Sequence, residues 1–186
     1  MAQTLSTMMI ALGAQAPDFN LPDSVSGNSI ALNDVKSNKA TVVMFISNHC
    51  PFVKHVKEEL AKLSNDYLAK GIAFVAIGSN DVEKYPDDAP EEMKKLANEL
   101  GFRFPYLYDE TQDVARAYHA VCTPDFFIFD GDLKCIYRGQ LDGSRPGNNI
   151  PVTGKDIRAA LNAVVSGEKV NPNQLPSIGC NIKWKD

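Results

Sequence analysis

The chain has 186 residues, which is long enough for one domain with a continuous core that needs no disulfide cross-links. Apolar residues make up 44% of it and charged residues 23%, as in globular proteins that fold in water. A net charge of −4 gives no reason to expect a nucleic-acid partner, and no apolar run approaches the roughly 18 residues that would span a membrane. We therefore expect no nucleic-acid or membrane partner, a single domain over residues 1–170 and an extended tail over residues 171–186.

The N-terminal segment carries a short apolar stretch at residues 8–16 that ends like a signal-peptide cleavage site. A secretory signal also needs lysine or arginine near its start, and residues 1–7 contain neither. We expect this segment to pack on the core and the protein to be cytoplasmic. The four cysteines are far apart and form no C-x-x-C or zinc-type pair, which in a reducing compartment indicates a redox site. We expect no cofactor and no bound metal.

Hydrophobic periodicity and turn residues predict strands and helices in alternation along the chain. A hairpin with its turn at residues 26–28 is expected first, and residues 171–186 show no periodicity. Further strands are expected at residues 41–46, 72–77, 104–107, 126–129 and 135–138. Helices are expected at residues 51–70, 90–100, 112–120 and 153–166. This order predicts an α/β fold with a central mixed β-sheet, helices on both faces and an N-terminal β-hairpin.

The most informative stretch covers residues 41–54, where an apolar strand ends in a polar break and a cysteine precedes a helix. Pro51 suits the first helical position, because its missing N–H costs nothing there. Cys50 is then expected where unpaired N–H groups and the positive end of the helix dipole favour an anion. His49 and Lys54 could each add positive charge. These features predict a thiol of lowered pKa at Cys50, with an inert buried cysteine as the alternative.

Several short motifs resemble those of one known fold. Cys50-Pro51 at a helix start, Thr123-Pro124 before a strand and Tyr-Arg-Gly at residues 137–139 are similar to the thioredoxin fold. The Ala-Pro-Asp-Phe opening at residues 16–19 resembles the redoxin and peroxiredoxin branch, of the alkyl hydroperoxide reductase/thiol-specific antioxidant type. The resemblance covers about residues 13–167, and the stretches around Cys50, Thr123 and residues 178–185 also resemble a bacterial peroxiredoxin-like subgroup. It implies a thioredoxin-like fold and a cis peptide bond before Pro124, in a loop packed against Cys50.

This chain departs from the resembled families at two positions near Cys50. Thioredoxins carry a resolving cysteine three residues after the first, where this chain has Val53. Peroxiredoxins carry a proline seven residues before the reactive cysteine, where this chain has Val43, although Ser47 matches their serine or threonine. The resemblance also gives Arg138 a role in holding the thiolate and peroxide. Because Arg138 lies later on its strand than the peroxiredoxin arginine, a salt-bridged or solvent-facing side chain is an equal alternative.

The missing local cysteine leaves two distant candidates for a resolving thiol. Cys122 precedes the Thr-Pro loop, and the resemblance implies that it lies across the site from Cys50. Cys180 could reach Cys50 from a flexible tail, but ordering such a tail costs about 1–2 kcal/mol for each residue fixed. We therefore rank Cys122 above Cys180, with an inert thiol as the alternative for each.

Other polar and thiol side chains are expected to have structural roles. Cys135 alternates with its neighbours inside a predicted strand and is expected in the core. Asp125 follows the Thr-Pro loop and is interpreted as an ordinary turn residue. The acidic pairs at residues 87–88 and 91–92 are expected in a solvated loop and a helix start.

The sequence thus predicts a thiol-dependent oxidoreductase whose nucleophile is Cys50. In the leading hypothesis its thiolate attacks a disulfide, and a second thiol resolves the mixed disulfide. In the alternative it attacks hydrogen peroxide or an alkyl hydroperoxide and becomes a sulfenic acid. The expected partners are a protein disulfide or peroxide as substrate, and a thioredoxin or small thiol as reductant. A thioredoxin-fold metal chaperone and a non-catalytic binding module are less favoured. The residues expected to form the site are Cys50, Cys122, Thr123, Pro124, Ser47 and Arg138.

Overall fold

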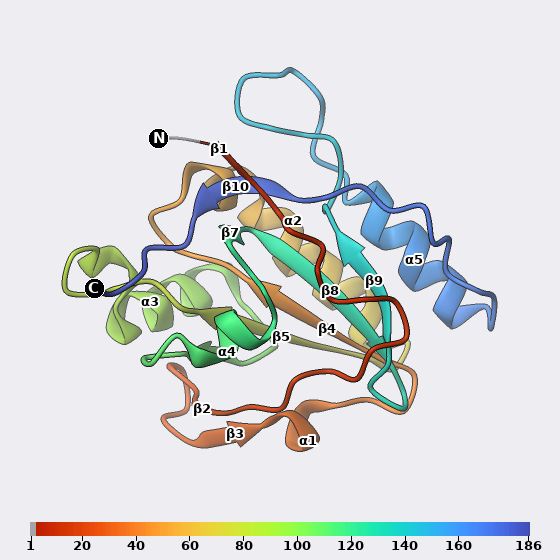
Figure 1. Cartoon of the computed structure of the whole chain (residues 1–186), viewed down its shortest axis with the longest axis horizontal. Coiled ribbons are helices and arrows are strands. Elements are labelled where there is room, and N and C mark those ends of the chain that lie inside the picture. The colour runs from red at the N-terminus through yellow and green to blue at the C-terminus, as the bar shows by residue number, and fades with distance from the viewer. Residues whose placement is uncertain (1–2) are drawn as a thin grey trace.

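The computed structural model describes residues 3–186 and is built around a five-stranded sheet in the order β6-β5-β4-β8-β9 (Figure 1). Strands β4, β5 and β6 run parallel, whereas β8 is antiparallel to β4 and β9 is antiparallel to β8. The bounds of these strands are Ala40–Phe45 for β4, Ile72–Gly78 for β5, Tyr106–Tyr108 for β6, Asp125–Asp130 for β8 and Cys135–Gly139 for β9. The predicted α/β fold with a central mixed sheet is confirmed.

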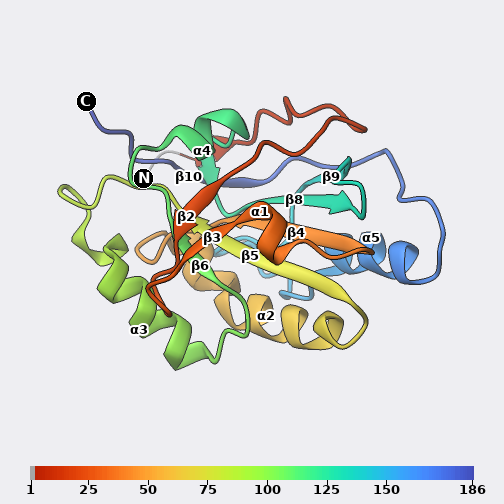
Figure 2. The same ribbon diagram turned by 90° about the horizontal axis from the view of Figure 1, so that it is seen from below.

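Helices lie on both faces of this sheet, and Figure 2 shows α2 and α4 on opposite sides. The helices are α1 (Leu32–Val35), α2 (Pro51–Leu68), α3 (Pro90–Leu100), α4 (Asp113–Ala117) and α5 (Lys155–Val165), with a 3₁₀ turn, η1, at Pro86–Asp88. Val42 and Met44 of β4 belong to a hydrophobic cluster shared with α2, α3 and α5. Val43 and Phe45 belong to a second cluster, shared with α4. Because successive strand residues point to opposite faces, β4 is buried along its whole length.

The elements predicted from apolar runs match the structure closely, and the largest difference is at α4. The expected hairpin is present as β2 (Asn20–Pro22) and β3 (Ser29–Ala31). The predicted helix at residues 112–120 is shortened to Asp113–Ala117. Gln112 and His119 flank it with φ values of 65° and 52°, a backbone conformation that a right-handed helix excludes.

The N-terminal segment packs on the core, as expected. Ile10 and Ala16 are 6% and 7% exposed and join the cluster that covers the α4 face of the sheet. The backbone N–H of Cys135 in β9 donates to the carbonyl of Ala14 at 2.8 Å. This contact fixes the segment against the edge strand of the five-stranded sheet.

The two ends of the described chain meet in a second, three-stranded sheet of order β1-β10-β7. Its strands are β1 (Gln3–Leu5), β10 (Ile178–Asn181) and β7 (Cys122–Thr123), and both neighbours of β10 are antiparallel to it. In Figure 1, β10 therefore runs along β7 on one side and β1 on the other. Within the expected extended tail, residues 178–181 thus form a strand that is held on both edges by backbone hydrogen bonds, so Cys180 needs no flexible segment to reach the site.

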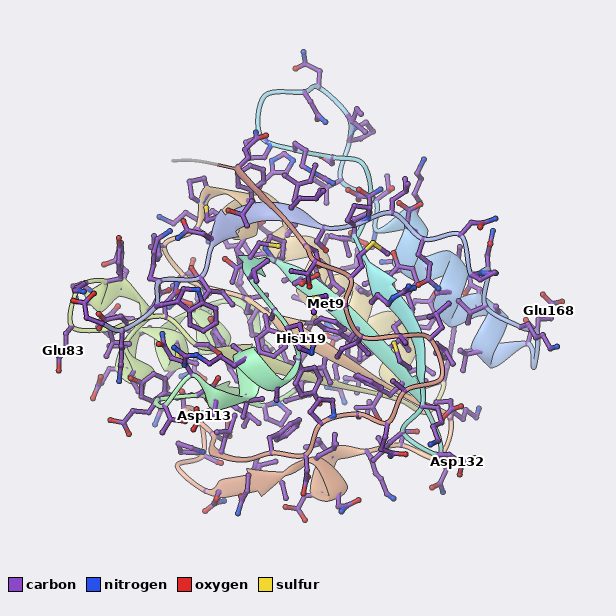
Figure 3. The ribbon with its side chains drawn as sticks, viewed as in Figure 1. Met9, Glu83, Asp113, His119, Asp132 and Glu168 are labelled. Carbon is purple, nitrogen blue, oxygen red and sulfur yellow. The ribbon has the colours of Figure 1, made fainter. Side chains whose placement is uncertain are left out.

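The surface of the described residues carries exposed charges around the edge of the molecule. Glu83, Asp132 and Glu168 are exposed, and their side chains project outward in Figure 3.

Within residues 3–186, no helix combines the length and the apolar character needed to cross a membrane.

Candidate active site

Cys50 lies where the polar break after β4 turns into α2. Pro51 is the first residue of this 18-residue helix, and the carbonyl of Cys50 accepts the N–H of Lys54 at 2.9 Å. The N–H groups of the first turn lack partners within the helix, and that of Val53 hydrogen-bonds the Cys50 sulfur. The Cys50 side chain is 0% exposed. The predicted position of Cys50 at the helix start is confirmed.

Two groups lie against the Cys50 sulfur. Its Sγ is 3.2 Å from the carbonyl oxygen of Thr123 and 2.8 Å from Sγ of Cys180. The peptide bond between Thr123 and Pro124 is cis, and the loop that contains it meets Cys50 through the Thr123 carbonyl. All four cysteines are free. Cys50 and Cys180 are therefore a pair of buried thiols in direct contact.

The register of the three-stranded sheet explains why Cys180 meets Cys50 and Cys122 does not. Cys180 is paired with Thr123, and Asn181 is paired with Cys122. Directly opposed residues share a face of a sheet, and successive residues point to opposite faces. The Cys122 side chain therefore points away from the face on which Cys180 touches Cys50, and its Sγ lies 4.0 Å from the cis-proline carbonyl. Cys180 is therefore the thiol in contact with Cys50, which reverses the ranking of Cys122 above Cys180.

The four thiols differ in acidity, and the pKa of Cys50 alone lies below that of an ordinary thiol. The hydrogen bond from the Cys180 thiol lowers it most and burial opposes this. Hydrogen bonds from the Thr123 side chain and from backbone N–H groups lower it further. The charges of His49 and Lys54, which the sequence suggested, are not among these causes. Hydrogen bonding to Cys50 and then burial raise the pKa of Cys180.

The remaining two cysteines are weakly acidic because they are buried. Burial raises the pKa of Cys122 well above its usual range and that of Cys135 to about 11. Cys135 is 1% exposed inside β9, as expected for a core residue. Neither has the environment of a nucleophilic thiolate.

A buried carboxylate, Asp88, holds the backbone that leads into α2. Its oxygens accept the backbone N–H of Asn48 at 2.6 Å, the side-chain amide of Asn80 at 2.9 Å and Nδ1 of His49 at 2.5 Å. Burial raises its pKa, but the hydrogen bonds from His49 and Asn80 outweigh this and leave it below the usual value. Asp88 is only 4% exposed, so the expectation of a solvated loop is wrong here. Asp88 is the second of two aspartates after Pro86, and this local sequence gives no signal for a contact about 40 positions away.

Ser47 hydrogen-bonds the backbone of Cys50. Among the described residues, none of its hydrogen bonds reaches the Cys50 sulfur. Its hydroxyl accepts the N–H of Cys50 at 3.3 Å and lies 3.3 Å from Nδ1 of His49. The imidazole of His49 in turn stacks on the ring of Tyr85, with centroids 4.9 Å apart. Residues 47–50 are thus fixed from both sides before the helix begins.

Asp125 directly follows the cis-proline and is fully buried at the start of β8. Ser6 donates its hydroxyl proton to the carboxylate at 2.9 Å. Burial raises the pKa of Asp125 to about 7, although hydrogen bonds from Ser6 and Ser177 oppose the rise. The structure corrects the interpretation as a turn residue, since this carboxyl group connects the segment after β1 to the five-stranded sheet.

Arg138 is a second sequence-predicted site residue that the structure does not bring into contact with the Cys50 sulfur. Its Nη1 donates to Oε1 of Gln174 at 3.1 Å, and its charge lowers the pKa of Cys135, against the dominant effect of burial. It is not among the groups that shift the pKa of Cys50. Within residues 3–186, no group of three or more His, Cys, Asp or Glu side chains is arranged to hold a metal ion.

A small cavity lies beside the cis-proline. It is lined by side chains that include Phe52, Val56, Pro124, Leu141 and Arg145, and its volume is about 20 Å³. A cavity of this size holds about one water molecule.

A buried cysteine pair at a helix start, facing a cis-proline loop, defines a thiol-dependent oxidoreductase of the thioredoxin-like class. The chain belongs to the AhpC/TSA family, whose sequence profile matches residues 12–138. It is similar to the crystal structure of an uncharacterized conserved protein from Geobacillus kaustophilus, at 64% identity and a TM-score of 0.97, covering 100% of this chain and 97% of that one.

Two more relatives extend the comparison. A hypothetical protein from Sinorhizobium meliloti 1021 is 49% identical with a TM-score of 0.94, and the match covers 98% of each chain. The thiol-disulfide oxidoreductase ResA of Bacillus thuringiensis (strain Al Hakam) is 26% identical over 125 residues, which is 67% of each chain.

Proposed function

We propose that this protein catalyses thiol–disulfide exchange with Cys50 as the nucleophile and Cys180 as the resolving thiol. The observation that carries the proposal is the 2.8 Å contact between their sulfurs at the start of α2. A lowered pKa makes Cys50 the thiol that is ionised first. Cys180 thereby takes the place of the cysteine that thioredoxins carry at the position of Val53.

Two displacements complete the exchange. The Cys50 thiolate attacks one sulfur of a substrate disulfide, and the other sulfur leaves as a thiolate with the bonding electron pair. The deprotonated Cys180 then attacks Sγ of Cys50, which forms the intramolecular disulfide and releases the second substrate sulfur as a thiolate. The substrate gains two electrons and the cysteine pair loses two, while the proton of Cys180 passes to a departing thiolate or to water. A thioredoxin or a small thiol returns the pair to the dithiol by the reverse exchange.

The electrostatics of the pair set the order of these steps. Hydrogen bonding to Cys50 and the negative charge of Cys50 both raise the pKa of Cys180. Cys180 therefore keeps its proton while Cys50 is a thiolate. Once Cys50 is bound in a mixed disulfide its charge is gone, and both of these causes disappear. The pKa of Cys180 then falls, which activates it for the resolving step.

Reduction of a peroxide by the same pair is a second candidate, because full burial of both thiols favours a small oxidant. Cys50 would attack one peroxide oxygen and release hydroxide or an alkoxide, and Cys180 would then displace water from the sulfenic acid. Two residues count against peroxide reduction. Val43 stands where peroxiredoxins carry a proline, and Arg138 is hydrogen-bonded to Gln174.

We also propose that the protein acts in a reducing compartment such as the cytoplasm, where four free cysteines persist.

Turnover of cysteine variants tests the function. We expect Cys50→Ser to abolish reduction of 2-hydroxyethyl disulfide by a thiol reductant. We expect Cys180→Ser to slow it at least 100-fold, because the mixed disulfide is no longer resolved internally. Cys135→Ser is the matched control and should keep the wild-type rate. Loss of turnover in Cys122→Ser together with normal turnover in Cys180→Ser would contradict the proposed pair.

A further inference from the structure

The backbone next to the reactive sulfur is already paired with the chain's own C-terminal strand. Cys180 of β10 lies opposite Thr123, the residue before the cis-proline, and Asn181 lies opposite Cys122. An extended peptide commonly docks on a protein by adding a strand to such an edge. In this molecule β10 already occupies that edge, and β1 covers the other side of β10 (Figure 1).

The packing between β10 and the cis-proline loop leaves no spare space. At Gly179 a side-chain Cβ would collide with the carbonyl oxygen of Thr123. Cys50 and Cys180 are 0% and 1% exposed. A second extended segment therefore cannot lie beside Thr123 while β10 is in place.

The residues that follow β10 are anchored by hydrogen bonds to the body of the protein. The N–H of Ile182 donates to the carbonyl of Val121 at 2.9 Å, and that of Lys183 donates to Oδ1 of Asn80 at 2.8 Å. The side-chain amide of Gln112 donates to the carbonyl of Lys183 at 2.8 Å. Displacing β10 would break these bonds together with its pairing to two strands.

We propose that β10 is a specificity element that reserves Cys50 for oxidants of low molecular weight and excludes extended segments of protein substrates. A small disulfide or peroxide needs only a local opening over the two sulfurs, whereas a polypeptide needs the Thr123 backbone that β10 occupies. The inference rests on the proposed function and narrows its substrate class. The covalent steps are those written above, with a low-molecular-weight disulfide as the oxidant.

The first test compares two probes on the reduced wild-type protein. We expect 2-hydroxyethyl disulfide to oxidise the cysteine pair at least 100-fold faster than insulin, at equal disulfide concentration and followed by loss of free thiols. Hydrogen peroxide in a third arm separates peroxide chemistry from disulfide chemistry. Oxidation by insulin within 10-fold of the small disulfide would overturn the inference. Lack of oxidation by every probe would instead refute the proposed function.

The second test weakens β10 directly. Gly179→Ala pushes the strand away from Thr123, whereas Gly143→Ala is the matched control, because a Cβ at Gly143 meets nothing within 4 Å. We expect Gly179→Ala to narrow the preference for the small disulfide over insulin at least 10-fold, and Gly143→Ala to leave it unchanged. An unchanged preference in a folded Gly179→Ala protein would overturn the role of β10. If that variant does not fold, the wild-type comparison alone decides.

Discussion

The acidity of Cys50 depends on a thiol that the chain supplies from 130 residues away. The position of Cys50 before α2 puts its sulfur near the N–H groups of the first turn, and the sequence predicts this contribution to its lowered pKa. The hydrogen bond from Cys180 contributes more to lowering its pKa, and burial works against both. Cys50 and Cys180 are therefore a coupled pair, in which each thiol shifts the pKa of the other.

Alkylation against pH tests this coupling. We expect the rate of Cys50 alkylation to reach half its plateau below the ordinary thiol pKa of about 8.5, because the thiolate persists at lower pH. In Cys180→Ala the hydrogen bond is lost, so the midpoint should move to higher pH. Cys135→Ala serves as the control and should leave the midpoint in place. A midpoint that does not respond to Cys180→Ala would mean that Cys180 does not tune Cys50.

At the scale of elements, the start of α2 is positioned by η1, the short turn that follows β5 in the chain. Asp88 in this turn binds the backbone of Asn48 and the ring of His49, and Ser47 binds the N–H of Cys50. Hydrogen bonds to a buried carboxylate are among the stronger ones in proteins. They fix the polar break in one conformation and so place the reactive sulfur.

Replacing this carboxylate should destabilise the fold. We expect Asp88→Asn to lower the free energy of unfolding at pH 7 by about 2 kcal/mol. The exposed neighbour Asp87 gives the matched control, because Asp87→Asn should change the free energy of unfolding by less than about 0.5 kcal/mol. Denaturant unfolding measures both, and equal effects of the two substitutions would contradict the role of Asp88.

The same variant carries a pH signature. The pKa of Asp88 is lowered in the folded state. Its ionisation therefore stabilises the protein fully at pH values above its pKa in the unfolded chain, which is about 3.9. That contribution is lost as the pH falls through the folded pKa. The difference in the free energy of unfolding between wild type and Asp88→Asn, measured by denaturant unfolding, should therefore shrink as the pH is lowered.

At the scale of the whole molecule, the five-stranded sheet could be predicted because its central strands are continuous apolar runs between polar breaks. The sequence predicts strands at residues 41–46 and 72–77, and β4 and β5 lie at Ala40–Phe45 and Ile72–Gly78. The sheet of β1, β10 and β7 could not be predicted, because its strands of two to four residues carry no periodicity and, unlike β2 and β3, are not joined by a local turn. Its register decides which cysteine faces Cys50, and register comes from pairing between distant segments. Without this register, the sequence alone favours Cys122 over Cys180.

The most direct test of the cysteine pair is the disulfide that forms in the whole protein. Reduced protein is treated with one equivalent of 2-hydroxyethyl disulfide, trapped by acid and alkylation, digested without reduction and mapped by mass spectrometry. The sulfur contact predicts a Cys50–Cys180 disulfide, with Cys122 and Cys135 recovered as alkylated thiols. A Cys50–Cys122 disulfide, or a Cys50 that stays joined to the probe while Cys180 is alkylated, would contradict it.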